Sequence, residues 1–139
     1  MKQFSSEDFQ AATGVSRETL DRLRTYAVLL QKRNRTLNLV SASTIPDLWH
    51  RHFFDSAQLA PLAPVGARAW LDIGSGAGFP GLVLAILGAG EVHLVERSGK
   101  KAAFLREVVE ATGATAVVHA LPLEELTRLE LAPDGADVV

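Results

Sequence analysis

The spacing of apolar positions predicts helices over roughly the first 60 residues of this chain. Residues 5–12 are typical of a short helix that ends before Gly14, and Ser16 is a typical N-cap for a longer helix. In that longer segment apolar side chains recur every three, four or seven residues, the period of an amphipathic helix: Leu20, Leu23, Ala27, Leu30 and Leu37. We expect it to fray within residues 34–38, and we expect a third helix over residues 47–59.

From Ala69 onward the predicted elements alternate between strand and helix. Strands are expected at residues 69–72, 91–96 and 115–119, and a fourth begins at residues 136–139. Helical segments are expected between and after the first three strands, at residues 82–87, 100–112 and 124–129. This alternation is typical of parallel βαβ units, so the fold class is α/β with a doubly wound sheet.

The length of the chain limits its domain organisation. With 139 residues, 47% of them hydrophobic, it is long enough for one core and too short for two ordinary domains. We therefore expect a helical segment (1–64) and a sheet segment (65–139) to form one compact domain. Because the sequence stops at its fourth predicted strand, we expect an incomplete sheet of about four strands, whose exposed edge invites pairing with another chain.

Composition excludes several classes of site. The absence of cysteine rules out disulfides, thiolate zinc sites and a cysteine nucleophile. No apolar run approaches the roughly 20 residues of a membrane span, and the first residues lack the apolar centre of a signal peptide, so we expect a cytoplasmic protein without a membrane partner. His50, His93 and His119 are scattered and lack the spacing of metal ligands, so we expect no metal.

Basic residues are concentrated in the first part of the chain. Residues 1–55 hold eight Lys and Arg against six Asp and Glu, although the formal net charge of the whole chain is −2. This imbalance is compatible with phosphate contacts and equally with a solvated helix face. The candidate residues for contacts with a nucleic acid are Lys32, Arg33, Arg35, Arg51, Arg97, Lys100 and Lys101.

A glycine-rich turn after the first predicted strand carries the strongest chemical signal. Gly76, Gly78 and Gly81 satisfy the dinucleotide spacing G-x-G-x-x-G, which keeps a nicotinamide or flavin site open. Asp72 and Gly74 precede them, however, and give the D-x-G-x-G-x-G form typical of S-adenosylmethionine sites.

Two acids complete this candidate site. Asp72 ends the first strand and can favour an ammonium group, and glycine amides can receive a carboxylate. Glu96 ends the second strand and can accept hydrogen bonds from both ribose hydroxyls. The structural alternative for both acids is exposure at a strand end or helix capping, and Phe79 is either a pocket wall or part of the core.

Four segments in order closely resemble the RsmG (GidB) family of ribosomal RNA methyltransferases. Two lie upstream of the turn, Asn38-Leu39-Val40-Ser41 and Arg51-His52-Phe53-Phe54-Asp55-Ser56. The third is the turn itself, Asp72-Ile73-Gly74-Ser75-Gly76-Ala77-Gly78-Phe79-Pro80-Gly81. The fourth is Glu96-Arg97-Ser98-Gly99-Lys100-Lys101, followed by Phe104-Leu105.

The resemblance implies a Rossmann-like class I methyltransferase fold with an N-terminal helical layer. It also implies a monomer that transfers a methyl group from S-adenosylmethionine to N7 of a guanosine in 16S, small-subunit ribosomal RNA, alone or in a ribosomal particle, leaving S-adenosylhomocysteine. Guanine N7 carries a free lone pair and loses no proton, so the reaction needs positioning rather than a general base.

The resemblance also assigns roles to individual residues. The methionine end of the cofactor is lined by Gly74, Ser75, Gly76, Gly78 and Phe79. Glu96 binds the ribose, and Leu123 and Glu124 contact the adenine.

His52 and Asp55 are the candidate positioning residues, since they share a helix face with Ser56. The alternative for this group is an internal polar network that ties the helices to the sheet.

The resemblance ends at the C-terminus. The family continues after an Asp-x-Val-Val strand into an arginine-containing segment and further strands, whereas this sequence stops at Val139. We therefore expect a fragment that binds the cofactor poorly and does not methylate. Two other functions stay open: a non-catalytic RNA- or ribosome-binding module, and a dinucleotide-binding oxidoreductase of the NAD type.

Overall fold

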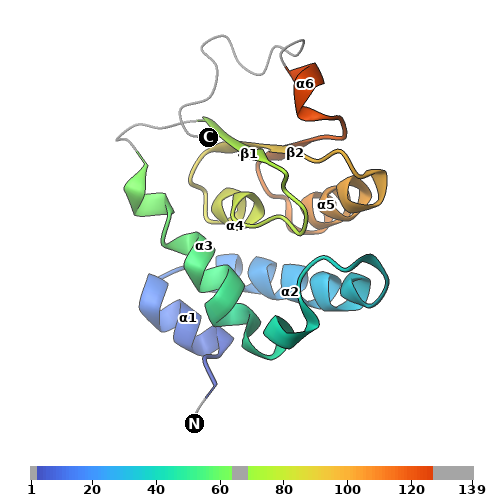
Figure 1. Cartoon of the computed structure of the whole chain (residues 1–139). Helices are drawn as coiled ribbons and strands as arrows, with labels where there is room; N and C mark the ends of the chain where they lie inside the picture. Colours follow the sequence, from blue (N-terminus) through green and yellow to red (C-terminus); the bar gives the residue numbers. More distant parts are fainter. Residues whose placement is uncertain (1–2, 64–68, 127–139) are drawn as a thin grey trace.

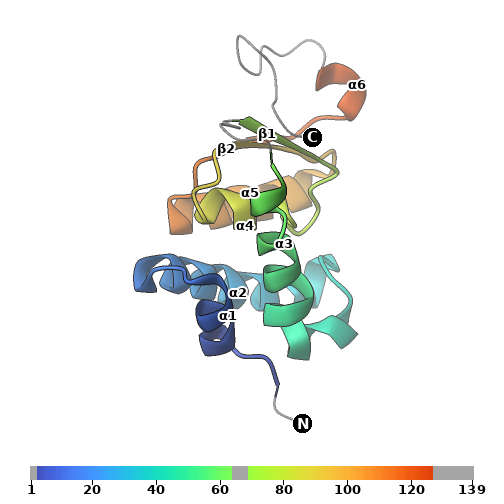
Figure 2. The ribbon, with the colours of Figure 1, turned by 90° about the vertical axis from the view of Figure 1, so that its left-hand side faces the viewer.

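The computed structural model describes residues 3–63 and 69–126 and arranges them in three layers. Figures 1 and 2 show the sheet on one side, the helices α4 and α5 beneath it, and the N-terminal helices beneath those. The expected boundary between the helical and sheet segments falls at residues 64–68, outside the described part of the chain. In that described part, no helix is long and apolar enough to cross a membrane.

The first two helices begin at side-chain caps. α1 (Ser6–Thr13) starts at Ser5, whose hydroxyl accepts from the Asp8 amide while the Asp8 carboxylate accepts from the Ser5 amide, a reciprocal capping box. α2 (Arg17–Leu37) starts at Ser16, as expected, and ends where Asn38 takes a left-handed conformation. The helix therefore ends inside the range of residues 34–38 where we expected it to fray, and it stays regular through Leu37.

The helical stretch expected over residues 47–59 is present over residues 48–57, but it is not a regular α-helix. The chain instead forms a 3₁₀ turn η1 (Ala42–Asp47), a π turn η2 (Trp49–Phe54), a short α3 (Asp55–Ala57) and a 3₁₀ turn η3 (Ala60–Leu62). Pro46 lies in η1 and has no amide hydrogen to donate. In the wide η2 turn, Trp49 and Phe53 pack edge to face with ring centroids 4.6 Å apart.

The sheet contains three parallel strands with β2 at its centre. β1 (Ala69–Ile73) pairs with β2 (Glu91–Val95), which pairs with β3 (Ala116–His119). The connections are α4 (Gly81–Ile86) and α5 (Gly99–Thr112), and α6 (Leu123–Leu126) follows β3. This confirms the α/β class with parallel βαβ units, while the fourth strand expected at residues 136–139 lies outside the described residues.

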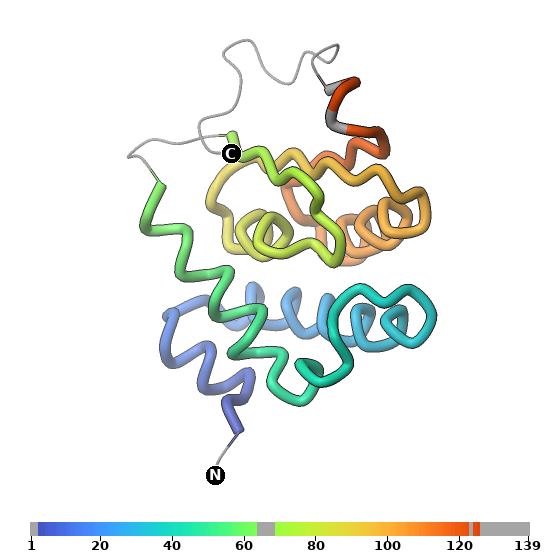
Figure 3. The backbone as a smooth tube through the Cα atoms, in the orientation of Figure 1, coloured from blue at the N-terminus to red at the C-terminus, as the bar shows by residue number. Residues whose placement is uncertain are grey.

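The layers share one hydrophobic core. Val92 and Leu94 of β2, Leu82 and Leu84 of α4, and Leu105 of α5 are almost fully buried in a cluster that also contains side chains of α1, α2 and η2. In Figure 3 the green segment that contains α3 carries the chain from the helical layer up towards the sheet. Figures 1 and 3 show the α2 helix running beneath the two crossover helices.

Tyr26 of α2 fixes the helical layer to the glycine turn. Its side chain is fully buried, and its hydroxyl donates to the Ala77 carbonyl, 51 residues away in sequence. Its ring also stacks with Phe79, with centroids 5.5 Å apart and planes 18° apart. Burial and the nearby Asp72 carboxylate raise the pKa of the Tyr26 hydroxyl, so it remains a neutral donor.

We expect Tyr26→Phe to lower the free energy of unfolding by about 1–3 kcal/mol, because the Ala77 carbonyl loses its buried donor while the ring packing remains. Urea unfolding followed by the fluorescence of the two tryptophans measures this change. An unchanged unfolding free energy would show that the hydroxyl does not hold the two layers together.

Candidate cofactor and nucleic-acid sites

The turn between β1 and α4 folds back on the end of β2. The amides of Gly74 and Ser75 both donate to the Val95 carbonyl, at 2.9 and 3.1 Å, and the Ser75 hydroxyl donates to the Asp72 carbonyl at 2.9 Å. The Gly78 amide then donates to the Ser75 carbonyl at 2.7 Å. These bonds hold the turn tightly at the carboxyl edge of the sheet, where ligands of open α/β sheets bind.

The glycines of this turn have two different roles. A Cβ on Gly78 would lie 2.5 Å from the Tyr26 hydroxyl, and a Cβ on Gly81 would lie 2.5 Å from a methyl of Leu94, so both glycines permit close packing. Gly74 and Gly76 have positive φ angles of 70° and 52°, and a Cβ on either would meet nothing closer than 3.9 Å. Gly74 and Gly76 therefore border open space in which a ligand can lie, while their own amides are already donated to Val95 and Glu96.

Glu96 joins the two turns that leave β1 and β2. Its side chain is 7% exposed, with one carboxylate oxygen accepting from the Gly76 amide at 2.8 Å and the other from the Ser98 amide at 2.7 Å. The sequence did not single out Ser98, although Ser98 also caps α5 by accepting from the Lys101 amide. A serine just before a helical pattern is the signal that could have identified it.

Asp72 lies under the same turn and caps α4. In the parallel register Asp72 is opposite Leu94, so its side chain is on the face covered by α4, where a carboxylate oxygen accepts from the Gly81 amide at 2.9 Å. Helix capping, the structural alternative, is thus observed for Asp72. Burial raises the pKa of Asp72 to about 6, and the Gly81 hydrogen bond opposes this shift only in part.

Phe79 contacts aromatic rings of the helical layer. It stacks with Tyr26 and with His52, whose ring centroid lies 4.9 Å away with planes 17° apart. We expected Phe79 to be either a pocket wall or part of the core, and this packing places most of the ring in the core. Part of Phe79 also lines a cavity with His52, Asp55 and Ser56. The structure thus places these three polar residues around one space. Leu123 and Glu124 begin α6, after β3.

His52 is held in place on two sides. Its Nε2 atom lies 2.8 Å from the Thr44 hydroxyl, in addition to the stacking on Phe79. Burial, and secondarily the Arg51 charge, lower the pKa of His52, while Asp55 opposes the shift. His52 is therefore neutral at pH 7, and its tautomer is set by the Thr44 contact.

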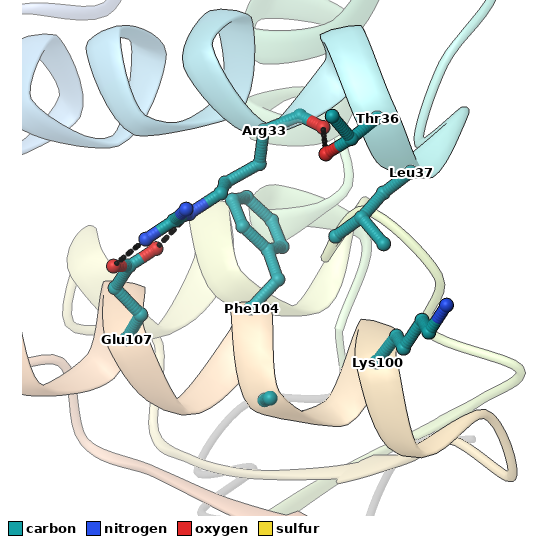
Figure 4. Close-up of a pocket in the computed structure, with 7 residues that line it drawn as sticks. Arg33, Thr36, Leu37, Lys100, Phe104 and Glu107 are labelled. Atoms are coloured by element: carbon teal, nitrogen blue, oxygen red, sulfur yellow. Dashed lines mark hydrogen bonds and ion pairs between the residues drawn. The ribbon is translucent and has the colours of Figure 1, made fainter.

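The structure joins two basic segments that are far apart in the sequence. Arg33 of α2 and Lys100 of α5 line one pocket of about 380 Å³ (Figure 4). The Arg33 guanidinium makes two hydrogen bonds to Glu107, at 2.9 and 2.8 Å, whereas Figure 4 shows the Lys100 side chain pointing away from that pair. Arg33 therefore connects two helices, and Lys100 remains available to a ligand.

The remaining basic candidates differ in exposure. Lys101 is half-buried, whereas four others are exposed: Lys32, Arg35, Arg51 and Arg97.

Two histidines that looked scattered in the sequence are neighbours. The β2–β3 register brings His93 Nδ1 to 3.0 Å from His119 Nε2, and Glu91 lies 2.8 Å from the other nitrogen of His93. Only strand pairing creates this contact, so no local pattern of residues could predict it. Across residues 3–63 and 69–126, no group of three or more His, Asp or Glu side chains is arranged to hold a metal ion.

We expect the stability of the protein to fall as pH rises from about 4 to 7 through Asp72. The folded state keeps the Asp72 proton up to a pKa of about 6, whereas the unfolded chain loses it near 3.8, so the folded state is favoured at low pH and this advantage is lost as pH rises through 6. Asp72→Asn removes the titration, so its stability relative to the parent chain should increase by about 2 kcal/mol over this range.

Urea unfolding at several pH values tests this expectation, with the exposed Asp21→Asn as control. A constant difference between Asp72→Asn and the parent chain across pH 4–7 would contradict it.

Comparisons with known proteins find one family along most of the chain. A family model described as rRNA small subunit methyltransferase G (GidB) matches residues 19–127. A protein of Rhodospirillum centenum, named ribosomal RNA small subunit methyltransferase G, is 64% identical over 122 residues, which are 88% of this chain and 56% of the relative. Relatives of the same name from Paramagnetospirillum magneticum and Parvibaculum lavamentivorans are 55% and 50% identical, over 96% of this chain and 62% and 60% of their own lengths.

The chain thus spans between 56% and 62% of the length of these three relatives. The family model covers both the helical layer from α2 onward and the three strands, with the turn and Glu96 inside the matched range. The chain therefore belongs to the GidB family of small-subunit ribosomal RNA methyltransferases.

Proposed function

We propose that this chain supplies the cofactor site for the S-adenosylmethionine-dependent methylation of guanosine N7 in small-subunit ribosomal RNA. The observation that carries the proposal is the buried Glu96 carboxylate, fixed by two amides beside the open glycines Gly74 and Gly76. A ribosomal substrate also implies a cytoplasmic site of action. Whether the protein acts as a monomer stays a prediction.

The residues at the turn fit S-adenosylmethionine in shape and in chemistry. Each Glu96 oxygen has a further lone pair beyond its amide bond, so the carboxylate can accept from ribose hydroxyls. Gly74 and Gly76 border open space in which the methionine end can lie, while Gly78 gives the turn its close packing. The Ser75 amide and hydroxyl bind Val95 and Asp72 and so hold the turn in this shape. Asp72 supplies a negative charge close to this backbone, suited to an ammonium group.

Methyl transfer to guanine N7 requires only binding and orientation from the protein. When bound, S-adenosylmethionine supplies a methyl group on a sulfonium, which guanine N7 can accept without a proton transfer. The chain's own residues hold the reactants, and the neutral His52 and nearby Asp55 are positioning candidates beside the turn. Leu123 and Glu124, at the start of α6, remain the proposed adenine contacts.

A dinucleotide-binding oxidoreductase is disfavoured by the geometry of Gly81. Dinucleotide sites place a pyrophosphate at the N-terminus of the helix that follows the glycine turn. Here the Asp72 carboxylate accepts from the Gly81 amide at 2.9 Å, so a negative group already holds that position. A diphosphate there would meet like charge.

We expect weak but saturable binding of S-adenosylmethionine and no binding of NAD in calorimetric titrations of this chain. Glu96→Gln should weaken S-adenosylmethionine binding at least tenfold. Both carboxylate oxygens of Glu96 accept from a backbone amide and can also accept from the ribose, whereas glutamine has only one acceptor oxygen. The variant should also lose the preference of the parent chain for adenosine over 2′,3′-dideoxyadenosine.

The matched control is Glu110→Gln, an exposed acid on α5. Binding of NAD in place of S-adenosylmethionine would contradict the proposal, as would an unchanged ribose preference in Glu96→Gln. Cofactor binding would likewise argue against the remaining alternative, a module that binds RNA or the ribosome and has lost the chemistry.

The pocket between α2 and α5 supports a contribution of basic residues to RNA binding. Lys100 is exposed at its rim and, among the described contacts, forms no ion pair, whereas Arg33 is bound to Glu107. The two basic residues of this pocket should therefore respond differently to substitution.

We expect Lys100→Gln to weaken binding of a small-subunit ribosomal RNA fragment and to reduce the slope of log K against log salt by about 1, without loss of stability. Arg33→Gln should instead lower the free energy of unfolding slightly, because it breaks a partly exposed ion pair. Filter binding at several salt concentrations and urea unfolding measure the two effects. Equal salt slopes for Lys100→Gln and the parent chain would show that Lys100 is only solvated surface.

A further inference from the structure

A second cavity lies beside the glycine turn, on the side of the helical layer. It has a volume of about 270 Å³ and combines charged, polar and apolar walls, with Arg51 and Asp55 from η2 and α3, and Phe79 and Pro80 from the turn. A space of this size suits a flat ring system smaller than a drug-sized ligand.

The polar groups of this cavity are divided between fixed and available side chains. His52 is engaged with Thr44 and Phe79 and forms a rigid wall. Arg51 and Asp55 are both exposed, and among the described residues neither side chain forms a hydrogen bond or an ion pair. They are four residues apart on one continuous helical segment, so a carboxylate and a guanidinium face the same space.

The donor and acceptor pattern of guanine matches this pair. Its Watson–Crick edge offers the N1–H and N2–H donors side by side, which a carboxylate accepts together, and the adjacent O6 acceptor suits a guanidinium. Adenine presents an acceptor at N1, which would meet the Asp55 carboxylate without a hydrogen. N7 lies on the adjacent Hoogsteen edge of the base, next to O6, and is not used by the Asp55 contact.

We propose that this cavity receives a guanine base extruded from the RNA, with Asp55 reading N1–H and N2–H and Arg51 contacting O6. The proposal rests on the proposed function, since it deepens the RNA side of the same site. Phe79 and Pro80 belong to the same turn as Gly74 and Gly76, so the base lies next to the proposed cofactor cradle. Enzymes that act on a base within RNA or DNA commonly hold it in such a pocket.

Titration with 9-ethylguanine and 9-ethyladenine, which carry neither ribose nor phosphate, tests the pocket separately from the cofactor cradle. Followed by NMR of the chain, 9-ethylguanine should shift the ring signals of His52 and Phe79 in a saturable way, and 9-ethyladenine should bind at least fivefold more weakly. Asp55→Asn should weaken 9-ethylguanine binding at least fivefold and remove this preference, Asp55→Glu should retain part of it, and Asp21→Asn should change nothing.

Calorimetry with S-adenosylmethionine on the same proteins distinguishes the two proposals. Guanine selectivity that depends on Asp55, in a chain that does not bind S-adenosylmethionine, would leave the pocket standing and overturn the proposed function. The opposite result is a parent chain that binds S-adenosylmethionine but binds 9-ethylguanine and 9-ethyladenine equally well. It would overturn the proposed guanine pocket, and it does not depend on whether the Asp55 variants fold.

Discussion

The contact between Tyr26 and the glycine turn sets the geometry on which both candidate sites depend. The Tyr26 hydroxyl reaches the Ala77 carbonyl only because Gly78 has no side chain, since a Cβ there would lie 2.5 Å from the hydroxyl oxygen. The same ring stacks with Phe79, which in turn stacks with His52. One buried side chain of α2 thus fixes the turn that exposes Gly74 and Gly76, and also the ring that forms one wall of the second cavity.

This arrangement changes how the glycine motif is understood. A D-x-G-x-G-x-G string is usually associated with ligand binding, yet two of the glycines here are required by packing. Gly81 admits Leu94 and the Asp72 carboxylate, and Gly78 admits Tyr26, while the open pair Gly74 and Gly76 remains for a ligand. The overlap of a dinucleotide spacing with this motif therefore follows from helix packing, and the spacing by itself does not indicate a pyrophosphate.

The sequence predicts best the elements whose signals are local. Ser16 before an amphipathic repeat predicted the start of α2, and alternating strand and helix patterns predicted the three strands and their parallel order. The irregular turns over residues 42–57 were missed, because a π turn depends on how rings such as Trp49 and Phe53 pack in three dimensions. The ion pair between Arg33 and Glu107 joins residues 74 positions apart and could be found only once α2 lay against α5.

The two acids of the candidate site also show which properties a local pattern predicts and which depend on the fold. The sequence identified both acids because each ends a strand, but it could not distinguish their environments. Glu96 is held by two amides, and its place at the end of β2 follows from the strand itself. Asp72 has one amide partner and is buried enough for its pKa to rise to about 6, which only the fold could reveal.

This difference between the acids bears on the ligand. A buried carboxylate with a raised pKa lacks a positive partner, so a ligand that brings a cation to Asp72 would recover part of the lost solvation. A diphosphate would increase the charge repulsion at the start of α4, whereas an ammonium group would relieve it. The environment of Asp72 therefore favours an amino-acid-bearing nucleoside over a dinucleotide, on physical grounds that are independent of family membership.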